Sequence, residues 1–129
     1  MADIWDETPN DLDASVLKTL ARDTNLSILG ELLVSFSTEM SQQVKAITLA
    51  SKGGDIDTLS GICHTMKGLS ATFGAKTQGE MMLQIELAIH HGHGDKISEM
   101  VAGVERESED TKERIFQVVA LIKEHNEQQ

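Results

Sequence analysis

One histidine in this chain, His64, stands among residue types that suit a nucleophile open to a second molecule. An α-helix turns by about 100° per residue, so the imidazole would lie roughly opposite the apolar stripe that its helix buries. That stripe consists of Leu59, Ile62, Met66, Leu69 and Phe73. The outer face around the histidine carries Ser60, Gly61, Lys67, Gly68 and Ala71. A histidine side chain is partly unprotonated at neutral pH, and this one is placed where another molecule can reach it.

Two neighbours of His64 are glycines inside the predicted helix, Gly61 and Gly68. Each costs on the order of 1 kcal/mol relative to alanine, so helix stability does not explain them. The two glycines are explained instead by the room that they leave for a second molecule to approach the imidazole. Lys67 follows at i+3 and neighbours the histidine on the helix surface, where its ammonium can offset the charge of an incoming anionic group.

The run His64-x-x-Lys67-Gly68-x-Ser70-x-x-x-Gly74-Ala75 resembles the active helix of histidine-containing phosphotransfer (HPt) domains. The resemblance continues in Ile85-Glu86-Leu87-Ala88 and in His91-Gly92-His93-Gly94-Asp95, which are similar to the family's next helix and its Gly-Asp turn. It implies a phosphorelay intermediate. In that family the histidine accepts a phosphoryl group from an aspartate on one receiver domain and passes it to another.

The resemblance also implies roles for particular residues. Nε2 of His64 would carry the phosphoryl group, and Lys67 would stabilise its charge. In the family a polar residue of the next helix often orients the imidazole through Nδ1. Alignment on Gly74-Ala75 brings Glu86 to that place, with Gln84 as the alternative if the helix register slips. The residues expected to contact the partner are Ser60, Gly61, Lys67, Gly68 and Ala71.

The expected partners are the receiver domain of a hybrid sensor histidine kinase and the receiver domain of a response regulator. The sequence contains no GxxxxGK[ST] loop and no other glycine-rich nucleotide loop. We therefore expect a phosphocarrier without an ATP site or autonomous kinase activity, rather than an enzyme. The Mg²⁺ needed for transfer would be bound by the partner receiver domain, and no cofactor or metal is expected on this chain.

A second cluster, His90-His91-x-His93, leaves open an alternative function as a helical metal-binding protein. Three imidazoles can bind zinc or nickel. Adjacent histidines point about 100° apart on a helix, however, and His93 lies in a glycine-flanked turn. Cys63 adjoins His64, but the two side chains diverge on the helix, and the cysteine is expected to be a small buried residue. A purely structural adaptor is the remaining alternative, tested by whether His64 takes up phosphate.

Composition sets the outer limits. The 129 residues fit one domain, and 40% hydrophobic but only 3% aromatic residues favour a helical bundle over a sheet. A net charge of −10 argues against nucleic acid and gives no support for an anionic membrane. One cysteine excludes an internal disulfide, and neither a signal peptide nor a membrane span is recognisable. These features predict a cytoplasmic protein, and a charged surface without a long heptad seam favours a monomer.

Hydrophobic periodicity predicts an all-α fold, an antiparallel up-down four-helix bundle with a short additional N-terminal helix. The expected helices begin near Asp13, Asn25, Asp55 or Asp57, Lys76 and Asp95. Short glycine-containing connections favour antiparallel neighbours. The charged middle of the last helix, Glu105 to Arg114, is expected to leave the core for water. The predicted organisation is an irregular lead-in at 1–10, one HPt-like bundle at 11–125 and a tail at 126–129.

Overall fold

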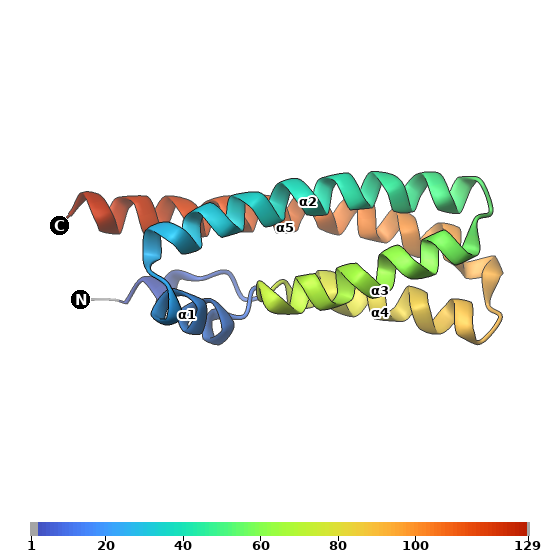
Figure 1. Cartoon of the computed structure of the whole chain (residues 1–129), viewed down its shortest axis with the longest axis horizontal. Coiled ribbons are helices and arrows are strands. Elements are labelled where there is room, and N and C mark those ends of the chain that lie inside the picture. The colour runs from blue at the N-terminus through green and yellow to red at the C-terminus, as the bar shows by residue number, and fades with distance from the viewer. Residues whose placement is uncertain (1–2, 129) are drawn as a thin grey trace.

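A computed structural model describes residues 3–128 as a bundle of long antiparallel helices (Figure 1). The elements are η1 (Ile4–Glu7), α1 (Ala14–Asp23), α2 (Leu26–Lys52), α3 (Ile56–Thr72), α4 (Lys76–His90), η2 (Gly94–Lys96) and α5 (Ile97–Glu127). Helix α2 packs mainly against α5, and α3 packs mainly against α4. The short α1 lies at the end of the bundle where α5 ends. The predicted fold class, a four-helix bundle with a short additional N-terminal helix, is confirmed.

The two ends of the described chain are more regular than predicted. The expected irregular lead-in contains the 3-10 helix η1, and α5 continues into the expected tail as far as Glu127. Residues 1, 2 and 129 of those two segments lie outside the described residues.

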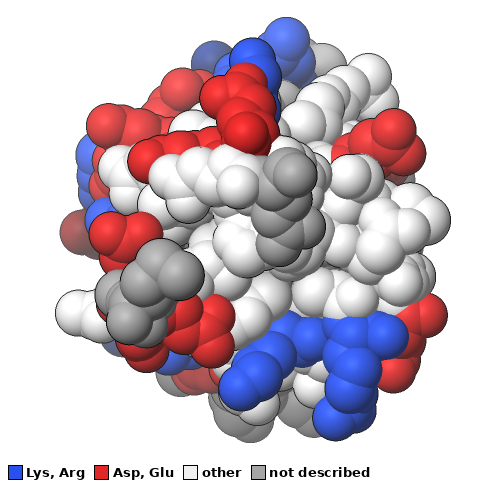
Figure 2. All heavy atoms as spheres, turned by 90° about the vertical axis from the view of Figure 1, so that its left-hand side faces the viewer, with Lys and Arg blue, Asp and Glu red and all other residues white. Residues whose placement is uncertain are grey.

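None of the helices between residues 3 and 128 has the length and apolar character that crossing a membrane requires. Figure 2 shows the end of the molecule at which α1 lies and α5 ends; acidic side chains are spread around its rim, and basic side chains form one group at the bottom of the view and another at the top.

Three helices have a side-chain N-cap at the position that the sequence predicts. Asp13, Asn25 and Asp55 each accept backbone hydrogen bonds from the first turn of the helix that follows. Such a cap satisfies amides that have no partner within the helix and contributes about 1 kcal/mol. Of the two predicted starts for α3, the cap is Asp55 and not Asp57. The last α-helix begins at Ile97, after η2, slightly later than predicted.

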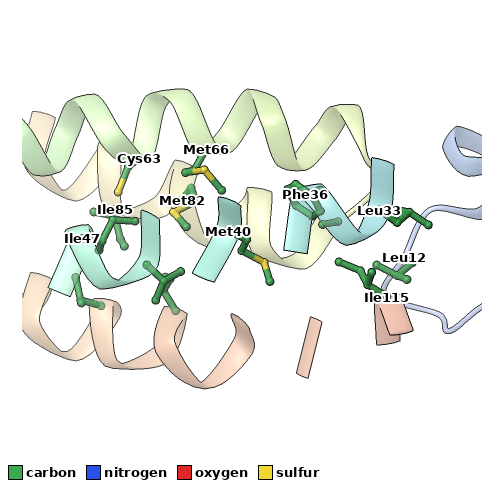
Figure 3. Packing of buried hydrophobic residues seen from close by; sticks show 14 of the residues in the cluster. Leu12, Leu33, Phe36, Met40, Ile47, Cys63, Met66, Met82, Ile85 and Ile115 are labelled. Carbon is green, nitrogen blue, oxygen red and sulfur yellow. The ribbon is translucent and has the colours of Figure 1, made fainter. Parts of the chain in front are cut away.

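The core fills the space between the α2–α5 pair and the α3–α4 pair (Figure 3). Figure 3 labels Leu12, Leu33, Phe36, Met40, Ile47, Cys63, Met66, Met82, Ile85 and Ile115. Met40, Met66 and Met82 are fully buried, so these methionines fill the core, as flexible thioether side chains often do. The rings of Phe36 and Phe73 stack with centroids 5.0 Å apart. This contact ties α2 to the end of the helix that carries His64.

The charged middle of α5 does not leave the core, and that prediction is wrong. Ser108 and Thr111 are buried there, with 7% and 2% of their surface exposed. They continue the inward-facing positions of the helix at a spacing of three to four residues, while most of the charged side chains face outward. Arg114 also pairs with Asp11 of the N-terminal segment. Small polar side chains therefore keep this segment packed on the bundle.

Gly74 fixes the turn between α3 and α4. Its φ of +71° lies in the left-handed region that glycine adopts without strain. A Cβ at this position would lie 3.0 Å from the carbonyl oxygen of Asp13. The amide of Asp13 donates a 2.7 Å hydrogen bond to the carbonyl of Gly74, and Leu12 and Ala75 form an isolated antiparallel bridge beside it. The turn thus ties the N-terminal segment to the helix that carries His64.

We expect Gly74→Ala to lower the free energy of unfolding by about 2–4 kcal/mol, because it combines backbone strain with a close backbone contact. Gly92→Ala is the matched control, since Gly92 has a φ of +74° but no atom within 4 Å of an added Cβ. That control should lose only about 1–2 kcal/mol. Urea unfolding of both variants measures the difference. Equal losses would show that the approach of Asp13 imposes no cost.

Candidate functional site

His64 projects from the middle of α3 into solvent, with 71% of its side chain exposed. On the same helix Cys63 and Met66 are fully buried, so the histidine faces away from the core as predicted. A Cβ added at Gly61 or Gly68 would meet no atom within 4 Å. Packing therefore requires neither glycine, and the surface beside the imidazole is open.

Glu86 of α4 connects His64 to Lys67. Its Oε2 lies 3.1 Å from Nδ1 of His64, and its Oε1 lies 2.9 Å from Nζ of Lys67. A carboxylate only accepts hydrogen bonds, so this contact assigns a proton to Nδ1 and leaves the lone pair of a neutral ring on Nε2. No described residue forms a hydrogen bond with Nε2. Gln84, the alternative, is exposed and donates to Glu80 at 2.9 Å instead.

The Glu86 carboxylate stays ionised at neutral pH. Burial raises the pKa of Glu86, but hydrogen bonds and charge from Lys67 and His64 outweigh burial and leave that pKa below its ordinary value. A carboxyl whose pKa is lowered by folding stabilises the folded state above its unfolded pKa. That contribution disappears as the pH falls through the lowered pKa. Across the neutral range the imidazole therefore keeps an anionic acceptor at Nδ1.

Two shallow hollows adjoin Lys67 and Leu83 on the surface. The first, of about 370 Å³, is lined by Ser60, Lys67, Leu83, Glu86, Leu87, Ile89 and His90. The second, of about 380 Å³, is lined by Asp13, Val16, Lys67, Ala71, Gly74, Lys76, Gly79, Glu80 and Leu83. Of the residues predicted to contact a partner, Ser60 borders the first hollow, Ala71 borders the second and Lys67 borders both. Gly61 and Gly68 are exposed on the same helix.

The chain resembles known proteins over most of its length. A family model described as the Hpt domain matches residues 31–124, most of the chain. The chain belongs to the Hpt domain family. A solved Hpt protein, histidine-containing phosphotransfer protein B (HptB) from Pseudomonas aeruginosa PAO1, is similar in fold with a TM-score of 0.73. The two are 21% identical, and the match covers 93% of this chain and 97% of the other. No curated protein matches this chain.

Hpt domains are phosphocarriers in two-component signalling, and they interact with receiver domains. The resemblance noted in the sequence is thereby confirmed at the level of the family. The matched segment contains α3 and α4 entirely, including His64, Lys67 and Glu86. The matched segment begins after α1, so Asp13 and Val16, which line the second hollow, lie outside it.

Cys63 of this Hpt domain is buried and unreactive. Burial raises the pKa of its thiol to about 12, and the charge of Glu86 adds to the rise. The thiolate is the nucleophilic and metal-binding form of cysteine, so the thiol is unreactive at neutral pH. Cys63 points into the core (Figure 3), whereas His64 is exposed. The geometry therefore gives no support to joint chemistry by these two adjacent residues.

The histidine cluster at the end of α4 has no arranged metal site. The rings of His90 and His91 lie 5.4 Å apart between centroids, and those of His91 and His93 lie 6.1 Å apart. In the part of the chain that the structure describes, no group of three or more His, Cys, Asp or Glu side chains could hold a metal ion. The metal-binding alternative therefore has no preformed site among these residues.

His90 lines the first hollow with Lys67 and Glu86, a position that the sequence, which suggests His90 only as a metal ligand, does not reveal. His90 lies four residues after Glu86, so both fall on one face of α4, and both line the first hollow. The i+4 spacing was the available signal. It becomes informative only when the pairing of α3 with α4 is known.

Proposed function

We propose that this chain is a phosphorelay intermediate that carries the phosphoryl group on Nε2 of His64. The donor is the aspartyl phosphate of a receiver domain in a hybrid sensor histidine kinase, and the acceptor is the aspartate of a response regulator. Membership of the Hpt family supports phosphotransfer. The observation that carries the assignment to His64 is the bond between Nδ1 and Glu86 on an exposed histidine, because it directs Nε2 to the partner.

In the proposed step the lone pair of Nε2 attacks the phosphorus of the aspartyl phosphate. The N–P bond forms, the P–O bond to the aspartate breaks, and the partner's carboxylate leaves with the electron pair. The imidazole keeps its proton on Nδ1 and becomes positively charged. Glu86 stabilises that charge through the 3.1 Å contact, a role that second partners of reactive histidines commonly have. The reverse sequence delivers the phosphoryl group to the acceptor.

Lys67 has a proposed electrostatic role in the same step. In the unphosphorylated site its ammonium pairs with Glu86, and 35% of the side chain is exposed. The Oε1 atom of Glu86 is buried and has Lys67 as its partner. An ammonium has three donors, so Lys67 can contact the phosphoryl oxygens while it still pairs with Glu86. There it offsets the charge that the transferred group brings.

In this proposal the chain leaves the binding of nucleotide and of Mg²⁺ to its partners. The sequence contains no glycine-rich nucleotide loop, which supports a phosphocarrier without its own ATP site or kinase activity. Mg²⁺ is assigned to the receiver domain, where the aspartate that exchanges the phosphoryl group lies. The site is complete within one copy of the chain, since His64, Lys67 and Glu86 come from two neighbouring helices, and this supports a monomer.

The decisive experiment detects phosphate on His64. Pure protein is incubated with phosphoramidate, a partner-free donor, and separately with phosphorylated receiver domains and Mg²⁺. Mass spectrometry under basic conditions should find acid-labile, base-stable phosphate on His64 in both cases. Absence of phosphate from every donor, with the helical circular-dichroism signal intact, would refute the proposal. The metal-binding alternative would then be examined by titrating Zn²⁺ and Ni²⁺.

A prediction for Glu86 follows from its contact with Nδ1. We expect Glu86→Leu to slow transfer from a receiver by at least about tenfold, because the Nδ1 proton and the charge on the ring lose their acceptor. Glu86→Gln keeps an acceptor oxygen without the charge, so its transfer rate should be several times higher than that of Glu86→Leu. Nitrogen-15 NMR of His64 should show the Nδ1–H tautomer in the wild type and a mixture in Glu86→Leu. An unchanged tautomer would mean that Glu86 does not orient the ring.

A further inference from the structure

His90 borders the proposed phosphotransfer site from α4 and has no part in the chemistry described above. It lines the first hollow together with Lys67 and Glu86, and its side chain is exposed. Its ring lies beside that of His91. Within residues 3–128 its imidazole forms no hydrogen bond and no ion pair. Its donor group is therefore available to another molecule.

The pairing of α3 with α4 explains why His90 lies at this place. The contact between His64 and Glu86 shows which residues of the two antiparallel helices lie opposite each other. One turn farther along the seam, four residues before His64 and four after Glu86, come Ser60 and His90. Both line the same hollow. The helical turn next to the phosphotransfer site thus carries a hydroxyl, that of Ser60, and an imidazole, that of His90.

A protein that reaches Nε2 of His64 also covers the neighbouring surface formed by Ser60 and His90. An ordinary protein interface buries about 800 Å² on each partner, which is a disc of about 16 Å radius, and half that area still gives about 11 Å. His90 lies four residues beyond Glu86, or about 6 Å along the helix axis. Its exposed side chain therefore falls inside the area that a docked partner occupies.

The chemistry of the hollow indicates what His90 offers a partner. The charges of Lys67 and Glu86 are paired with each other. Leu83 and Leu87 provide an apolar surface, and Leu87 is 39% exposed. An imidazole donates at least one hydrogen bond whether it is neutral or charged. Apart from the Lys67–Glu86 pair, the polar side chains of this hollow are those of Ser60 and His90.

We propose that His90 is a contact residue for the receiver domain that docks on His64. Its imidazole donates a hydrogen bond to an oxygen acceptor on the receiver, a carboxylate or a backbone carbonyl, while an apolar side chain of the receiver packs on Leu83 and Leu87. This inference rests on the proposed function of His64. Because His90 acts on docking and not on the N–P bond, its loss should weaken saturation by the receiver and change the maximal transfer rate little.

The test compares two adjacent exposed histidines. Receiver domains of the source organism are phosphorylated with acetyl phosphate and Mg²⁺, and the transfer rate is measured against receiver concentration. His90→Leu should raise the half-saturating concentration about three- to tenfold, with the maximal rate within about twofold. His90→Gln retains a donor and should recover most of the affinity. His91→Leu is the matched control, since His91 does not line the hollow, and it should behave as wild type.

The outcomes separate this inference from the proposed function. Equal half-saturation for His90→Leu and His91→Leu would overturn the contact, and a His90→Gln variant as weak as His90→Leu would overturn the hydrogen bond. Phosphoramidate labelling of His64 in each variant provides the reference, and the loss with receivers must exceed any loss in that labelling. If wild-type protein takes phosphate from no donor, the proposed function itself fails. If phosphoramidate labels His64 but no receiver does, the relay and the contact fall together.

Discussion

The variant His64→Gln should lose phosphoryl transfer entirely while keeping its fold. Glutamine has no nitrogen able to form a stable bond to phosphorus, so no residual rate is expected above the detection limit. The side chain of His64 is 71% exposed, and exposed substitutions away from caps and cores usually change the free energy of unfolding by no more than about 0.5 kcal/mol. Receiver-dependent labelling measures the first effect, and circular dichroism with urea unfolding measures the second.

The control for this variant is His91→Gln, because His91 is an exposed histidine that borders neither hollow. It should transfer phosphate as the wild type does. Two results would contradict the assignment. Phosphate retained on His64→Gln would place the acceptor elsewhere, and a loss of helical signal in the same variant would show that His64 supports the fold.

The variant Gly68→Gln should affect stability and transfer in opposite directions. An added Cβ at Gly68 meets no atom within 4 Å, so replacing a glycine inside a helix should raise the free energy of unfolding by roughly 0.5–1 kcal/mol. The longer side chain stands at i+4 from His64, on the surface that the partner must cover. We expect it to slow receiver-dependent transfer at least about tenfold, measured in the same labelling assay.

Gly68→Ala separates helix propensity from steric cover. It should give about the same gain in stability as the glutamine variant or slightly more, because alanine has the higher helix propensity, yet it adds one methyl group and should slow transfer much less. Ser35→Gln, at an exposed position of α2, tests whether a new glutamine on the surface matters by itself. Transfer at the wild-type rate by Gly68→Gln would show that the glycine does not keep the imidazole accessible.

Features that depend on neighbouring residues could be predicted from the sequence. The caps at Asp13 and Asn25 are local, because a side-chain oxygen and the amides of the next turn lie within four residues of each other. The exposure of His64 follows from helical periodicity alone. Helical periodicity also predicts that packing does not require the glycines beside it, and the open space at Gly61 and Gly68 agrees.

Features that depend on the pairing of helices could not be predicted in this way. Whether Glu86 or Gln84 meets His64 depends on how α4 lies along α3, and the sequence left both open until the 3.1 Å contact distinguished them. The position of His90 depends on the same pairing. In α5 the density of charge predicts solvent exposure, although Ser108 and Thr111 occupy the inward positions. Small polar residues fit against a bundle without apolar character, and periodicity of hydrophobic residues alone does not detect them.

The bridge formed by Glu86 makes the unloaded site electrically neutral. With the imidazole in its nucleophilic form, the positive charge of Lys67 and the negative charge of Glu86 cancel. A phosphoryl group of about −2 on a ring of +1 changes the local charge to about −1. The chain as a whole carries −10, so loading adds to a field of the same sign. Association with a receiver should therefore depend on ionic strength more steeply in the phosphorylated form, which gives salt titration a means of telling the two forms apart.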